Sequence, residues 1–131
     1  MFKIFNVLIV FTTIAILAAC GAAGSDPVQL SAKDAGTTVH LKPGDVLVVS
    51  LEGNPTTGYT WETAPGSGDL VAQQGEPEFK ADTSALGSGG VMTLRFTAVK
   101  QGTAPLKLIY HRTFEPGVAP LQSFEVTVVV E

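Results

Sequence analysis

Cysteine, histidine and charge are all scarce in this chain of 131 residues. Its single cysteine excludes a disulfide framework and a zinc site built on several cysteines. The two histidines fall on the polar phase of their segments and lack the spacing of a local metal pair. Only 15% of residues are charged, the formal net charge is −4, and the absence of a basic cluster argues against a nucleic-acid partner. Neither a phosphate loop nor a Gly-x-Ser-x-Gly motif occurs, so a binding protein is favoured over an enzyme.

The first 19 residues have the composition of a targeting signal and not of a folded segment. Lys3 is their only charge, and an apolar run from Ile4 to Ala19 follows it. This run is shorter than the about 20 apolar residues that a membrane-spanning helix needs, and small residues close it. Residues 17–20, Leu-Ala-Ala-Cys, resemble the bacterial lipobox, in which the peptide is cut before the cysteine and the cysteine is acylated.

The lipobox resemblance implies a lipoprotein on the extracytoplasmic side of a bacterial membrane. Residues 1–19 would be the signal peptide, and Cys20 would carry the lipid. Residues 20–30 would hold this cysteine and a flexible tether, because the segment after it is small and polar. Several acyl chains hold a protein firmly, since each buried methylene contributes about 0.8 kcal/mol. The alternative is an ordinary secretory signal in which Cys20 is incidental.

Residues 31–131 are long enough for one domain with a real core and contain several segments of period two. Apolar and polar side chains alternate at residues 38–41, 92–98, 106–111 and 124–130, whereas residues 70–79 are less regular. The apolar run at residues 46–51 is typical of a strand covered on both faces. Turn-forming glycine and proline separate these segments. The pattern predicts an all-β, immunoglobulin-like β-sandwich of about seven strands without a disulfide.

One turn stands out because its sequence is more elaborate than a sandwich turn requires. It reads Asn54, Pro55, Thr56, Thr57, Gly58, Tyr59. Pro55 fixes its own φ and holds Asn54 extended, and Gly58 permits a positive φ before the next strand. The result is a stiff, uncharged tip that loses little entropy on binding. Trp61, in phase with Tyr59, is predicted to be a core residue of that strand.

Residues 54–59 resemble the hallmark of the chagasin-like inhibitors of papain-family cysteine peptidases, Asn-Pro-Thr-Thr-Gly followed by an aromatic residue. Two weaker motifs follow in the order of that family. Gly87, Ser88, Gly89 and Gly90 are similar to its Gly-x-Gly-Gly loop. Arg112, Thr113 and Phe114 are similar to its Arg-Pro-aromatic element, with Thr113 in place of proline. The resemblance extends from about Thr37 to Glu131.

The resemblance implies that all three loops lie at one end of the sandwich and enter a protease cleft without forming a covalent bond. Pro55 to Gly58 would be the wedge, with Thr57 closest to the catalytic cysteine and histidine. Gly87 to Gly90 would lie against one wall of the cleft, and Arg112 and Phe114 would anchor the other. The implied protein is a monomeric inhibitor that needs no cofactor or metal and acts on papain-like cysteine peptidases.

Two other functions are compatible with the same sequence. One is a non-inhibitory, immunoglobulin-like binding or adhesion lipoprotein that uses the same end of the sandwich. The other is a hydrolase whose site the sequence does not reveal. Glu76 and Glu78 could face one way on a strand, although a solvated edge explains such a pair more simply.

Overall fold

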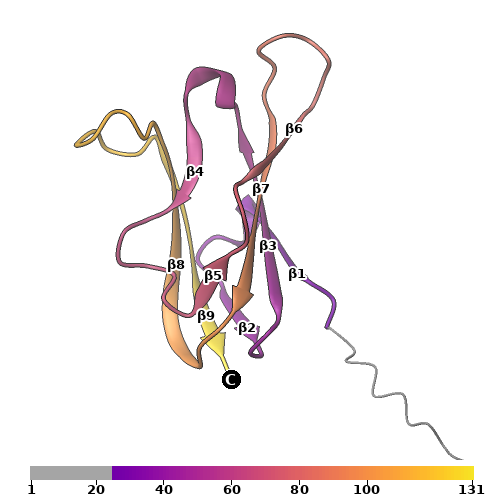
Figure 1. Cartoon of the computed structure of the whole chain (residues 1–131), viewed down its shortest axis with the longest axis vertical. Helices are drawn as coiled ribbons and strands as arrows, with labels where there is room; N and C mark the ends of the chain where they lie inside the picture. Colours follow the sequence, from indigo (N-terminus) through magenta and orange to yellow (C-terminus); the bar gives the residue numbers. More distant parts are fainter. Residues whose placement is uncertain (1–24) are drawn as a thin grey trace, which may run out of the picture.

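Nine β-strands and two short 3-10 helices form residues 25–131, the part of the chain that the computed structural model describes (Figure 1). The predicted signal peptide and Cys20 lie outside the described residues. The strands are β1 (Val28–Ser31), β2 (Thr38–Leu41), β3 (Val46–Gly53), β4 (Thr60–Thr63), β5 (Val71–Gln73), β6 (Glu78–Ala81), β7 (Gly90–Ala98), β8 (Gly102–His111) and β9 (Gln122–Val130). The 3-10 helices are η1 (Ala32–Asp34) and η2 (Pro55–Thr57).

Two mixed sheets stack to form the predicted all-β sandwich. One sheet has the order β1-β3-β7-β5, with β6 also paired to β7, and the other has the order β2-β9-β8-β4. The pairs β1–β3 and β2–β9 are parallel, and the remaining pairs are antiparallel. Residues 25–131 contain no cysteine, so no disulfide joins the two sheets in this part of the chain.

The structure has more strands than the predicted number of about seven, for two reasons. The sequence predicts that residues 28–30 belong to the flexible tether, whereas in the structure they form part of β1, which pairs with β3. The less regular segment at residues 70–79 contains β5 and the start of β6, two short strands that both pair with β7. Such short segments carry little periodicity of their own, because their partners in the sheet determine that they form strands.

The core lies between the sheets and is formed by the apolar phase of the long strands. The buried side chains of β7, β8 and β9 are Met92, Leu94, Phe96, Ala98, Leu106, Leu108, Tyr110, Phe124, Val126, Val128 and Val130. In β3, Val48 is buried as well as its neighbours Leu47 and Val49, as the apolar run predicts for a strand covered on both faces. Burial of this apolar surface is the main force that stabilises the fold. The close-packed core gives the loops a rigid base.

One end of the sandwich carries the start of β3 and the C-terminus, and the opposite end carries three long connections. Val28 pairs with Leu47 near the start of β3, and β3 then runs to Gly53 at the opposite end. Figure 1 shows the C-terminus at the lower end and three long connections at the upper end. Within residues 25–131, no helix has the length and apolar character needed to cross a membrane.

Candidate functional site

The three loops singled out in the sequence lie together at the upper end of the sandwich (Figure 1). They are the central loop (residues 54–59), the second loop (residues 82–89) and the third loop (residues 112–121), which join β3 to β4, β6 to β7 and β8 to β9. Strand register explains their proximity, since Gly53 pairs with Gly90 and Thr60 pairs with His111. The central loop therefore lies between the other two.

The central loop is a single 3-10 turn with Asn54 as its N-cap. Asn54 is extended, with φ −143° and ψ 95°, and its side chain accepts a hydrogen bond from the N–H of Thr56 at 3.1 Å. The hydroxyl of Thr57 donates to the carbonyl oxygen of Asn54 at 2.6 Å. Gly58 ends the turn in the left-handed region, with φ +84°. These values confirm the backbone that the proline and glycine predict.

Asn54 also ties the central loop to the second loop. Its side-chain amide donates a hydrogen bond to the carbonyl oxygen of Gly87 at 3.0 Å. A short side chain thus makes contacts in two directions, because its oxygen caps the turn while its nitrogen reaches the neighbouring loop. The residue is required for the shape of two loops, which the sequence motif alone does not reveal.

The glycines of the Gly-x-Gly-Gly motif, which spans the end of the second loop and the start of β7, have different roles. Gly87 has φ +74°, and a Cβ atom there would meet nothing within 4 Å, so its side of the loop is open to a partner. Gly90 is buried at the start of β7, where a Cβ atom would clash with the backbone oxygen of Lys80. Gly90 therefore permits the close approach of β6 and lies away from the surface, whereas Gly87 remains available for contact. Leu86, at the tip of the same loop, is fully exposed.

Arg112 ties the third loop to the central loop. Its Nε donates a hydrogen bond to the carbonyl oxygen of Thr57 at 3.0 Å, and its Nη1 lies 3.1 Å from a carboxylate oxygen of Glu115. The guanidinium lies over the ring of Tyr59, with Cζ 4.5 Å from the ring centroid, and 6.0 Å from that of Phe114. Arg112 therefore stabilises the arrangement of the third and central loops, and it is also a candidate contact residue.

Thr113 and Phe114, which complete the Arg-Pro-aromatic element with Arg112, face solvent. Phe114 is 67% exposed, and its ring lies against Gly58, where an added Cβ atom would come within 3.0 Å of it. Thr113, in the position of the family's proline, is exposed in a turn. The third loop also exposes Val118 and Leu121, which the sequence motifs do not include.

Aromatic side chains support the central loop from below. The ring of Tyr110 lies between those of Tyr59 and Trp61, with centroid distances of 5.2 and 5.1 Å. Trp61 is 3% exposed and its indole N–H donates to the carbonyl oxygen of Glu52, which confirms it as a core residue. The hydroxyl of Tyr110 accepts a hydrogen bond from the backbone N–H of Asn54 at 2.8 Å. The sequence marks Tyr110 only as an apolar-phase strand residue two positions before Arg112.

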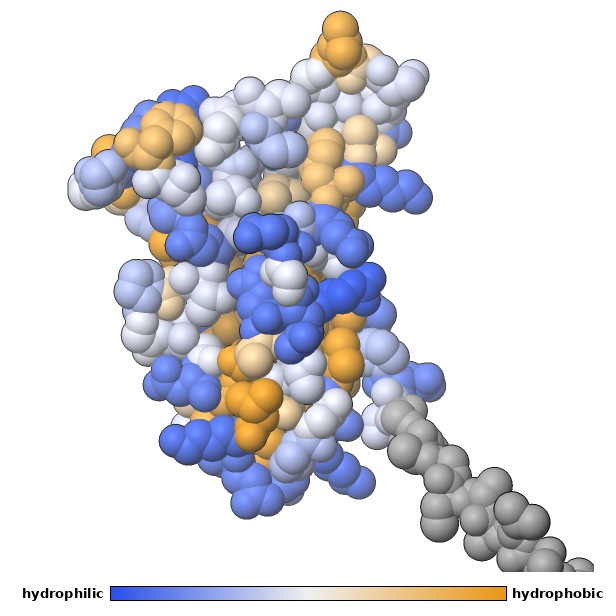
Figure 2. Space-filling model, viewed as in Figure 1, coloured by the Kyte–Doolittle hydropathy of each residue, from blue (hydrophilic) through white to orange (hydrophobic). Residues whose placement is uncertain are grey.

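The surface at this end of the sandwich has intermediate hydropathy in the middle and apolar patches at its sides. Figure 2 shows intermediate hydropathy across the upper middle of the molecule and apolar patches on the two outer loops. The exposed residues of the turn, Pro55 to Thr57, carry no charge. An uncharged tip can be desolvated without burying an unpaired charge, which suits entry into a narrow cleft.

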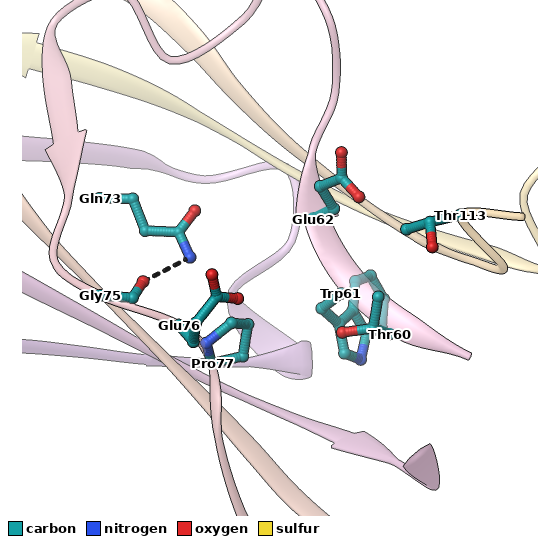
Figure 3. Close-up of a pocket in the computed structure, with 8 residues that line it drawn as sticks. All are labelled: Thr60, Trp61, Glu62, Gln73, Gly75, Glu76, Pro77 and Thr113. Carbon is teal, nitrogen blue, oxygen red and sulfur yellow. Dashed lines mark hydrogen bonds between the residues drawn. The ribbon is translucent and has the colours of Figure 1, made fainter. Parts of the chain in front are cut away.

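A groove beside this end of the sandwich contains carboxylate side chains. It has a volume of about 720 Å³ and is lined by Thr60, Trp61, Glu62, Gln73, Gly75, Glu76, Pro77 and Thr113 (Figure 3). Glu76 precedes β6 and Glu78 lies on it, and both are exposed. Glu62 lies 3.1 Å from His111, but within residues 25–131 no Ser, Thr or Cys side chain is hydrogen-bonded to this pair. Across residues 25–131, no three metal-ligating side chains gather into a candidate metal site.

The fold is a β-sandwich in which side-chain hydrogen bonds link three loops at one end. The profile described as Chagasin family peptidase inhibitor matches residues 40–128. The chain belongs to the chagasin family of peptidase inhibitors, and it is an inhibitor, not an enzyme.

Relatives agree with this assignment. The chain is 29% identical to amoebiasin-2 of Entamoeba histolytica over 107 residues, covering 77% of this chain and 83% of the relative. It is 28% identical to chagasin of Trypanosoma cruzi over 81 residues, covering 59% and 74%. The crystal structure of a cysteine protease inhibitor from Entamoeba histolytica matches with a TM-score of 0.67 at 28% identity, covering 80% of this chain and 96% of that one.

Proposed function

We propose that this chain is a reversible, non-covalent inhibitor of papain-family cysteine peptidases that fills the catalytic cleft with its three linked loops. The observation that carries the proposal is the pair of side-chain bonds that join the loops, from Asn54 to Gly87 and from Arg112 to Thr57. These bonds hold the three loops in a single arrangement in the free protein. Binding therefore loses little of the conformational entropy that three free loops would lose.

The hydrogen bonds of the turn also suggest why a protease would not cleave it. The carbonyl oxygens of Asn54, Pro55 and Thr57 all accept hydrogen bonds within the inhibitor. A scissile carbonyl must instead turn toward the nucleophile and the oxyanion donors of the enzyme. The turn can occupy the cleft while these three carbonyl groups remain held by hydrogen bonds within the inhibitor.

The test is to titrate papain with the mature chain, residues 20–131 without lipid, and to follow residual peptidase activity. Tight, reversible and stoichiometric loss of activity is expected. Full papain activity at micromolar inhibitor would favour a non-inhibitory binding module. Cleavage of the added chain would identify it as a substrate.

Replacing Arg112 with alanine is expected to weaken papain inhibition by about tenfold or more. The change removes a charge-assisted hydrogen bond to Thr57 and the packing over Tyr59, and such bonds contribute roughly 1.5–3 kcal/mol. Arg112→Lys should recover little, because an ammonium group lacks the planar fork. The measurement is the inhibition constant, with Arg95→Ala as a control on the outer face of the other sheet. An unchanged inhibition constant for Arg112→Ala would show that the contacts of Arg112 with Thr57 and Tyr59 are not needed for inhibition.

We further propose that the chain is a lipoprotein anchored through Cys20 to a bacterial membrane on its extracytoplasmic side. The support is the lipobox-like sequence at residues 17–20 and the direction in which the folded part begins. Val28 pairs with Leu47, six residues of β3 before Gly53, which is about 20 Å at the rise of a strand. A tether ending at Val28 would leave the loops directed away from the membrane.

Cys20→Ser is expected to release the protein from the membrane or to leave it unprocessed, because serine offers no thiol for the lipid. Fractionation of cells that express both forms measures this. Papain inhibition by the soluble chain should be unchanged, since residue 20 precedes the sandwich. Equal membrane retention of a correctly processed serine variant would contradict the lipid anchor.

A further inference from the structure

We propose that the phenolic oxygen of Tyr110 is a positioning group for the central loop, and that its role in inhibition can be separated from the role of its ring in the core. This inference rests on the proposed inhibition of cysteine peptidases. Tyr110 is 6% exposed and lies beneath the loop, so it acts on a protease through Asn54 and not by contact.

The geometry fixes this oxygen firmly. The Tyr110 ring lies between the rings of Tyr59 and Trp61, and Tyr110 pairs with Trp61 across β8 and β4. Rotation of the ring is restricted by this packing, so the hydroxyl is held at one place at the boundary of the core. There it accepts the backbone N–H of Asn54 at 2.8 Å, at the point where the chain leaves β3.

Asn54 is the residue through which this bond affects more than one loop. Its side-chain oxygen caps the central turn, and its side-chain nitrogen holds the carbonyl group of Gly87 in the second loop. The backbone oxygen of Tyr110 also accepts the N–H of Leu121, at the end of the third loop. Tyr110 is therefore connected to all three loops, to the second of them by way of Asn54.

The hydroxyl is not needed to fill the core. The ring already supplies the buried area, and phenylalanine has the same ring. Within residues 25–131, the hydroxyl has a single hydrogen-bond partner, the N–H of Asn54. Without that partner, a polar atom at this depth would lower stability compared with phenylalanine. Its placement is thus best explained by the orientation of the loop.

The test compares Tyr110→Phe with the unmodified mature chain, residues 20–131. Hydrogen exchange of the Asn54 amide should become at least about tenfold faster, while core strand amides stay protected. The association rate with papain should fall about three- to tenfold, because less of the free inhibitor holds the binding shape. The dissociation rate should change less than twofold, because the protease holds the loop once it is bound.

A matched control separates positioning from stability. The hydroxyl of Ser67, in the turn that follows β4, lies 3.1 Å from two acceptors, the carbonyl oxygens of Ala64 and Lys107, and accepts the N–H of Lys107. Ser67→Ala should lower the melting temperature but leave both papain rate constants unchanged, since this turn is far from the three loops.

Several results would overturn the inference. An unprotected Asn54 amide in the unmodified chain would remove its basis. So would an unchanged association rate for Tyr110→Phe, or failure of that variant to fold, which would make the hydroxyl a requirement of the core. If the unmodified chain does not inhibit papain, the proposed function fails, and the exchange measurement still decides whether the hydroxyl holds the loop.

Discussion

Replacing Thr57 with glutamate is expected to reduce papain inhibition by tens-fold or more while leaving the melting temperature near that of the unmodified chain. Thr57 is exposed at the tip of the central loop, where substitutions usually change stability by less than about 0.5 kcal/mol. In the complex, the same position is expected to lie nearest the catalytic pair of the protease. A carboxylate there would be buried without a partner, and every 1.4 kcal/mol of that cost is about tenfold in affinity.

The informative result for Thr57→Glu is the pair of values, melting temperature and inhibition constant. Thr103→Glu is a suitable control, because Thr103 is also exposed but lies at the other end of β8. It adds the same charge and should leave inhibition unchanged. A folded Thr57→Glu variant that inhibits at full strength would show that the central loop is only a turn, and the binding-module function would then be favoured.

Gly58→Val is expected to reduce both stability and inhibition. The backbone of Gly58 has φ +84°, which a β-branched residue adopts at a cost of about 1–3 kcal/mol. For a domain of this size such a loss lowers the melting temperature by roughly 5–15 °C. A side chain there would also displace the ring of Phe114 and approach Arg112. Inhibition should therefore weaken by at least about tenfold, equivalent to 1.4 kcal/mol.

The matched control for Gly58→Val is Gly66→Val. Gly66 has a similar φ of +79°, but a Cβ atom there would meet nothing within 4 Å, and its turn lies away from the three loops. Gly66→Val should therefore lose comparable stability and retain full inhibition. Calorimetry and papain titration of both variants measure the two effects. If Gly66→Val also lost inhibition, reduced stability alone would explain the result at Gly58.

The sequence was sufficient to predict the elements that depend on local chemistry. Period-two alternation identified the long strands, because one face of each must enter the core. The proline and glycine of the central loop predicted the extended Asn54 and the positive φ of Gly58, because these are steric properties of single residues. The short strand β1 was not predicted, and β5 falls in a segment that the sequence marks only as less regular, since pairing with a neighbour decides such strands more than their own composition does.

The tertiary structure alone decided how the motif residues act on one another. Arg112 and Thr57 are 55 positions apart, and Asn54 and Gly87 are 33 apart, so strand register and side-chain direction bring them into contact. The same is true of the buried Gly90, whose place against β6 follows from sheet pairing. The sequence by itself thus indicated which loops are the candidates for binding. Only the fold determined that these loops form one linked surface, because hydrogen bonds between distant residues exist only after the sheets have paired.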